Sequence, residues 1–179
     1  VWMMALATIW VAGVLAKLLV TSREYARVRN LLSSATETKR HAALYSSLGH
    51  KHGLSRLPPI VVSGDVPTPF VTGLFSPVIV LPTRQIFSES DINLLLGHEL
   101  AHVARRDLQF GLIALLAAIV VWFHPAIRYA VCAYRDAREM ACDTRVLARQ
   151  AVPAHRYGAV LLQVGVEAPG VYGIAAASR

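Results

Sequence analysis

The N-terminal segment from Val1 to Val20 is almost wholly apolar, with Lys17 as its only charged residue. As a helix, it would extend about 1.5 Å per residue, or roughly 30 Å, which matches the hydrocarbon core of a bilayer. Trp2 and Trp10 suit membrane interfaces, and a lysine near the end of a span can reach water. The segment predicts a transmembrane helix over residues 1–20. A signal peptide and a buried core helix are the alternatives.

Composition and charge favour a membrane protein. Apolar residues make up 55% of the 179 residues and charged residues 16%, whereas soluble domains have about 45–50% and roughly 25%. The net charge is +7, and residues 21–57 contain seven Lys or Arg against two acidic residues. Basic segments beside a span remain in the cytoplasm. Residues 21–57 therefore predict a basic cytoplasmic helical segment, and no direct nucleic-acid role is expected.

Between residues 24 and 88 the pattern changes from helix to strand and back. Residues 24–48 have helical spacing, and three short β-rich runs separated by turn residues follow between residues 60 and 81. They predict a small antiparallel sheet, with residues 78–81 as the edge strand that an extended substrate would join. A helix then begins near Ser88, where Asp91 would complete a capping box.

The helix after Ser88 contains an HExxH motif, His98-Glu99-Leu100-Ala101-His102. Histidines four residues apart share one helix face and can bind the same Zn²⁺. Glu99 would lie beside the metal, where it can take a proton from water and pass it to a leaving amine. The motif predicts a zinc site with Glu99 as the catalytic residue. Ordinary surface or core histidines are the alternative.

A catalytic zinc ion needs a third protein ligand, and Glu139 is the candidate. Asp143 lies four residues further along and would share its helix face, so one carboxylate can bind the metal while the other holds a ligand imidazole. Cys142 would lie on the wrong side of that helix to share the metal with Glu139. Cys132 and Cys142 are expected to be packed thiols, and two cysteines make no disulfide scaffold.

Four further residues are weaker candidates. Tyr157 and His155 are the side chains nearest in type to an oxyanion donor, although Tyr157 can equally be a packed aromatic residue. His50 and His52 form an HxH pair that is expected to be solvated in a loop.

A second apolar segment, Leu108 to Phe123, would form about 24 Å of helix, which is short for a span. His124-Pro125 ends it, since proline cannot continue the helix. His102 and Glu139 can bind one ion only if the chain returns, so residues 108–138 predict an apolar helical hairpin. This hairpin would enter the bilayer or pack against the first span. A core helix of a soluble domain is the alternative.

Four motifs occur together in an order that resembles the BlaR/MecR-type membrane metallopeptidases, the bacterial antirepressor or beta-lactam sensor-transducer family. They are residues 70–82, the HExxH motif with Arg105-Arg106-Asp107, residues 122–125 and residues 138–143. The resemblance covers about residues 25–165. It implies an α+β, mostly helical, gluzincin-like zinc metallopeptidase, with residues 58–179 forming the peptidase domain. It also implies a multi-pass protein of the bacterial plasma membrane with its active site at the cytoplasmic face.

The resemblance further implies roles for residues and partners. His98, His102 and Glu139 match the zinc ligands, Glu99 the general base and acid, and Asp143 the acid that supports a ligand. The family implies regulated proteolysis, with the chain itself or a transcriptional repressor as substrate, and self-association into a homo-oligomer is a further expectation. The sequence contains no penicillin-binding domain, so it does not by itself predict beta-lactam sensing.

Two other functions fit the same residues. A non-catalytic membrane signalling module would use the zinc ion only to hold helices together, and a fourth protein ligand would support it. A soluble metallopeptidase would bury the apolar segments in its core.

Overall fold

The computed structural model describes residues 1–38, 41–83 and 87–167, with side chains described through residue 163. Helix α1 runs without a break from Trp2 to Ser33. The helix therefore does not end near residue 20, because no proline or glycine interrupts residues 21–33. The single helix expected over 24–48 is also wrong, since strand β1 (Thr36–Glu37) separates α1 from helix α2 (Ala42–His52).

The sheet has four strands in the order β1-β2-β4-β3, with β2 at Ile60–Ser63, β3 at Phe70–Thr72 and β4 at Val78–Pro82. It is mixed, not antiparallel as expected, because β2 and β4 pair in parallel. The chain reaches β4 through β3, which forms an antiparallel hairpin on the far side of β4. As a result β4 is a central strand and β3 an edge, so the prediction of residues 78–81 as the edge strand was wrong.

Helix α3 (Glu89–Arg105) begins at Ser88 with the predicted capping box to Asp91. One face of α3 is buried between the sheet, α2 and α5, and Leu96 and Leu100 have no exposed surface. Nine residues of α3 are buried, which explains why this helix, with the motif it carries, is fixed relative to the rest of the core.

The predicted helical hairpin forms from α4 (Asp107–Val120) and the first part of α5 (Pro125–Gln150). His124 caps α5 and Pro125 occupies its first turn, where a proline costs no hydrogen bond. Helix α5 continues past the hairpin into the core, so its far half returns beside α3. Helix α6 (Ala154–Glu167) follows and contacts α3.

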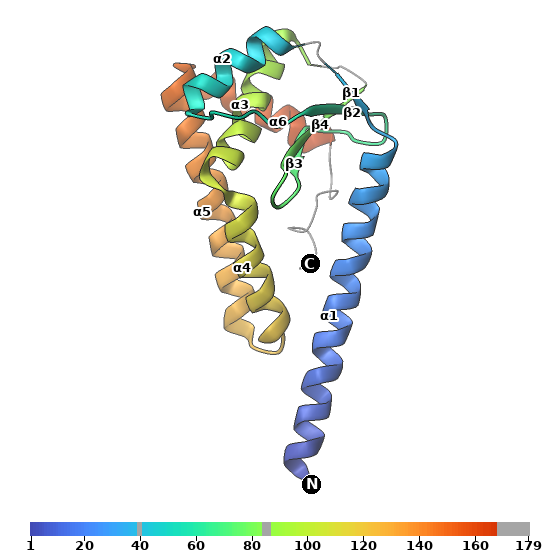
Figure 1. The fold of residues 1–179 in the computed structure, drawn as a ribbon. Helices are drawn as coiled ribbons and strands as arrows, with labels where there is room; N and C mark the ends of the chain where they lie inside the picture. Colours follow the sequence, from blue (N-terminus) through green and yellow to red (C-terminus); the bar gives the residue numbers. More distant parts are fainter. Residues whose placement is uncertain (39–40, 84–86, 168–179) are drawn as a thin grey trace.

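Two elements project from the same side of the body formed by the sheet and the helices α2, α3 and α6. They are the α4–α5 hairpin and the N-terminal half of α1 (Figure 1). Helix α1 is, among the described residues, the one helix long and apolar enough to cross a membrane by length and composition. None of its residues is buried, so it is not a core helix of the chain as described.

The tip of the hairpin touches α1 near the middle of the apolar segment. The Trp10 indole donates to the Val120 carbonyl oxygen at 2.8 Å, and the Trp122 indole donates to the Trp10 carbonyl oxygen at 3.3 Å. Gly13 lies against the Trp122 ring, where a Cβ atom would overlap it. A bulkier residue at position 13 would therefore force the Trp122 ring to move.

Candidate metal centre

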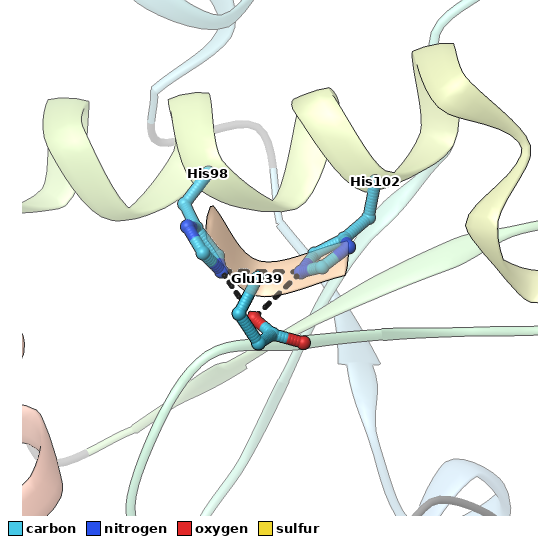
Figure 2. Close-up of side chains that lie close together, drawn as sticks. All are labelled: His98, His102 and Glu139. Carbon is cyan, nitrogen blue, oxygen red and sulfur yellow. Dashed lines mark hydrogen bonds and ion pairs between the residues drawn. The ribbon is translucent and has the colours of Figure 1, made fainter. Parts of the chain in front are cut away.

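His98 and His102 lie one turn apart on the same face of α3. Their rings meet edge to face with centroids 4.7 Å apart, and their Nε2 atoms are separated by 3.1 Å. Both Nε2 atoms point away from the α3 backbone toward α5, as Figure 2 shows.

Glu139 reaches this pair from α5. Its Oε2 atom lies 3.4 Å from Nε2 of His98 and 3.5 Å from Nε2 of His102. Nitrogen and oxygen ligands of one tetrahedral zinc ion, bound at 2.0–2.1 Å, would be about 3.3–3.4 Å apart. The three atoms are therefore spaced as ligands of a single ion.

Arg138 orients the Glu139 carboxylate. Its guanidinium donates to Oε1 at 2.7 and 3.1 Å, which leaves Oε2 directed at the two imidazoles. The Glu139 side chain is 41% exposed, so the site is open on this side. A substrate or a water molecule can approach a bound ion from there.

Behind His98, on the ring nitrogen opposite the site, lie Tyr157 and Asp143. Nδ1 of His98 is 2.8 Å from the Tyr157 hydroxyl and 3.3 Å from Oδ1 of Asp143, and the hydroxyl donates to that same oxygen at 2.8 Å. Asp143 thus lies in contact with the imidazole of His98. The Tyr157 hydroxyl faces Nδ1 and not the Nε2 side, which argues against the oxyanion role expected for it.

Behind His102 lie Asp107 and Cys142, which the sequence interpretation did not place in the site. Oδ2 of Asp107 is 2.9 Å from Nδ1 of His102, and the Cys142 thiol donates to the same oxygen at 3.2 Å. These three residues also form a possible metal-binding group. The 2.9 Å between Oδ2 of Asp107 and Nδ1 of His102 is an ordinary hydrogen-bond distance. In the sequence, the feature that could have pointed to Asp107 is its place as the first residue of α4, directly after the turn at Arg106.

The charges around the two imidazoles favour a cation. Burial lowers the pKa of His98, but its contacts with Asp143 and Glu139 outweigh burial and raise the pKa to about 9. Burial also lowers the pKa of His102. Its contacts with Asp107, Cys142 and Glu139 outweigh burial and raise the pKa to about 12. Burial would raise the pKa of Glu139, yet the two histidines hold it well below its usual range. A metal ion at the three ligand atoms would replace the protons that this anionic environment attracts.

Glu99 is buried between α3 and the edge strand β3. Burial raises the pKa of its carboxyl, against the lowering influence of His98, His102 and a hydrogen bond from the Val71 backbone. A buried carboxyl group next to a metal site can accept a proton from one reacting group and release it to another. The Val71 contact also places β3 directly beside the motif.

The HxH pair differs from expectation, because His50 and His52 both lie in α2 and not in a loop. His52 is the last residue of α2 and is 1% exposed, so its predicted place in a solvated loop was wrong. Neither of its ring nitrogens has a hydrogen-bond partner. His50, in the same helix, and His155, in α6, are exposed.

Comparison with known proteins identifies relatives of the chain. The family model described as BlaR1 peptidase M56 matches residues 1–178. The chain is 26% identical over 163 residues to Regulatory protein BlaR1 of Bacillus licheniformis, covering 89% of the chain and 27% of the relative. It is 31% identical over 110 residues to the methicillin resistance mecR1 protein of Staphylococcus aureus, covering 60% of the chain and 19% of the relative.

The chain thus spans about a quarter or less of the length of these relatives. The relative from Staphylococcus epidermidis, also named methicillin resistance mecR1 protein, gives the same 31% identity over 110 residues. Since the family model spans almost every residue, the chain belongs to the BlaR1 peptidase M56 family.

Proposed function

We propose that the chain is the catalytic part of a membrane-attached zinc metalloendopeptidase used in regulated proteolysis. The observation that carries this proposal is the triangle formed by Nε2 of His98, Nε2 of His102 and Oε2 of Glu139, with sides of 3.1, 3.4 and 3.5 Å. A group of three donors with an open side is typical of catalytic zinc sites, whereas structural sites have four protein ligands.

His98, His102 and Glu139 would hold the zinc ion. When bound, zinc would polarise a peptide carbonyl and make a water molecule more acidic. Glu99 would take a proton from the water as its oxygen bonds to the carbonyl carbon, and would return a proton to the nitrogen as the C–N bond breaks. Asp143 and Tyr157 would hold the His98 ring, and Asp107 the His102 ring, so that both Nε2 atoms stay unprotonated and directed at the ion.

The substrate would bind in extended form along β3. This strand is an edge of the sheet, and its Val71 backbone bonds to Glu99. A peptide that added to this edge would form main-chain hydrogen bonds and pass the general base. The substrate would therefore pair with β3 and not with β4. This pairing would keep the substrate close to Glu99.

The apolar segment of α1 would cross the membrane, with the basic residues that follow on the cytoplasmic side together with the active site. The α4–α5 hairpin would be the second membrane-inserted element. About 12 Å of helix separates Trp2 from Trp10, which the hairpin tip contacts, so the tip would lie well inside the bilayer. This contact favours a hairpin that re-enters the membrane over a second full crossing. The membrane would be the bacterial plasma membrane.

The names of the relatives, a regulatory protein and a methicillin resistance protein, support a signalling role for the proteolysis. We propose a protein substrate, either a transcriptional repressor or the chain itself. The chain would not bind nucleic acid directly, and self-association into a homo-oligomer would bring one copy to the active site of another.

The test is zinc binding together with cleavage. The chain purified in detergent should bind about one zinc ion per molecule, and Glu99→Gln should keep the metal and lose cleavage of a reporter peptide library. Glu89→Gln, at the exposed start of the same helix, is the matched control and should cleave like the parent. Equal turnover by Glu99→Gln would refute the catalytic assignment. Zinc binding by a parent protein without any cleavage would favour the signalling module with structural zinc.

A further inference from the structure

The loop between β3 and β4 exposes a large aromatic side chain. Phe75 is 86% exposed, the highest value for a large apolar residue among the described residues that follow α1. A single exposed apolar residue needs no explanation by itself, but this one lies at the tip of a short, well-defined loop.

The loop is held in one conformation and tied to α4. Gly73 has φ 95°, and a Cβ atom there would overlap the Ser76 carbonyl oxygen, so the turn requires glycine. The Gln109 side chain donates to the Leu74 carbonyl oxygen, one residue before Phe75. Phe75 is therefore presented beside the first turn of α4, where the apolar part of the hairpin begins.

The direction of the loop matches that of the two apolar elements. The β3–β4 loop points from the sheet toward the side on which the hairpin and the N-terminal half of α1 project (Figure 1). Helix α4 continues the apolar surface on this side with exposed Phe110 and Ile113. The exposed Gly64-Asp65 turn follows β2, which runs parallel to β4, so this turn lies at the opposite end of the sheet from Phe75.

We propose that Phe75 is a lipid contact, with its ring in the bilayer interface beside the start of α4. Phenylalanine, like Trp and Leu, occurs on the apolar faces of interfacial segments, where the ring enters the headgroup–acyl boundary while the polar groups beside it stay in water. The contact would hold β3 and Glu99 at the membrane surface and so favour substrates that lie close to the membrane. This inference rests on the membrane attachment proposed above.

A fluorophore at three positions tests the contact. Cys132→Ser removes the exposed thiol, while Cys142 is fully buried and does not react. Phe75→Cys, Leu6→Cys and Asp65→Cys are each labelled with nitrobenzoxadiazole and reconstituted in phosphatidylcholine and phosphatidylglycerol vesicles. Quenching is measured with doxyl-labelled lipid and with iodide in the water. Leu6, on exposed α1, is the membrane control, and Asp65 is the aqueous control.

We expect doxyl lipid to quench positions 6 and 75 to a comparable degree and iodide to quench only position 65. If position 75 behaves like position 65, the lipid contact is wrong while the attachment through α1 stands. A label at 75 that neither quencher reaches would mean that a protein surface, such as a second copy, covers Phe75, and it would also overturn the proposal. Quenching by iodide at both 6 and 75 would refute the membrane attachment itself.

Discussion

Each imidazole of the candidate metal centre has a carboxylate behind it, and the two carboxylates come from different parts of the chain. Asp143 lies one helical turn beyond Glu139 on α5, whereas Asp107 begins α4. Both contact Nδ1, at 3.3 and 2.9 Å. A carboxylate at this position fixes the tautomer and the ring angle and makes Nε2 a better ligand.

Asp107→Asn should weaken metal binding about 10- to 100-fold, because the amide is a poorer acceptor for the His102 N–H and carries no charge. The measurement is zinc competition with a chelator of known affinity, with helical content followed by circular dichroism. Asp136→Asn, at an exposed position of α5, should bind zinc like the parent. Unchanged affinity in Asp107→Asn would show that Asp107 does not support the ligand.

Outside the candidate metal centre, His52 makes the free energy of unfolding depend on pH. Burial and the nearby charges of Arg145, Arg149 and Lys51 lower the pKa of His52 to about 4. The unfolded chain, with a histidine pKa of about 6.5, binds the proton more readily. The folded state is therefore most favoured above pH 6.5, and its stability falls as the pH drops toward 4. One histidine can contribute at most about 3 kcal/mol to this loss.

His52→Leu removes this titration, so its stability relative to the parent should improve steadily between pH 7 and pH 4. Denaturant unfolding in detergent, with zinc at saturation in both proteins, measures the difference. His50→Leu, which alters an exposed residue of the same helix, should show no such trend. A pH-independent difference for His52→Leu would mean that His52 is not buried in its neutral form.

At the scale of elements, the contact between α1 and the hairpin depends on a glycine, which has no side chain. Gly13 leaves room for the Trp122 ring, while the two indole N–H groups bond to backbone oxygens across the interface. In a bilayer, close approach at small residues and interhelical hydrogen bonds are the main means by which helices associate. The hairpin tip and α1 should therefore behave as one packed unit.

Gly13→Leu should disrupt this unit, because the added side chain overlaps the indole ring. We expect a loss of about 1–3 kcal/mol, typical of overpacking, and a lower midpoint of thermal unfolding in lipid nanodiscs. Ala12→Leu, at an exposed neighbouring position of α1, should leave the midpoint unchanged. Equal midpoints for the two variants would place the hairpin away from α1.

At the scale of the whole molecule, the buried core and the exposed apolar elements are separate. The core lies among the sheet, α2, α3, α5 and α6, whereas the apolar half of α1 and four side chains of α4 remain exposed, namely Phe110, Ile113, Leu116 and Val120. An apolar surface of this extent is expected to face lipid or another protein. The candidate metal centre therefore lies in the body, one helix turn from the start of the apolar hairpin.

The membrane attachment predicts resistance to alkaline carbonate extraction. Ile9→Arg with Leu15→Arg should release the chain, since each arginine at the centre of a span costs about 2.5–3.5 kcal/mol. Tyr25→Arg, on the exposed basic part of α1, should stay in the membrane pellet. Retention of the double arginine variant would show that α1 is not the sole anchor.

Local features of the fold could be predicted because they depend on neighbouring residues. The capping box at Ser88 and the break at His124-Pro125 were confirmed, since a cap and a proline act within one turn. The pairing of β2 with β4 could not be predicted, because strand order depends on contacts between distant segments. The sequence did not predict that α1 continues to Ser33. The change from apolar to basic residues indicates a change of surroundings along the helix and does not indicate where the helix ends.

For the candidate site, the sequence by itself determined which chemistry is available: two histidines one helical turn apart, a glutamate between them and an acidic pair in a later helix. These depend on the helical period, which is fixed by the backbone. Only the tertiary structure decided that Glu139 lies 3.4–3.5 Å from both imidazoles, that Asp107 and Cys142 stand behind His102, and that Tyr157 backs His98. These contacts join α3 to α4, α5 and α6, and their distances follow from how the buried faces of those helices pack.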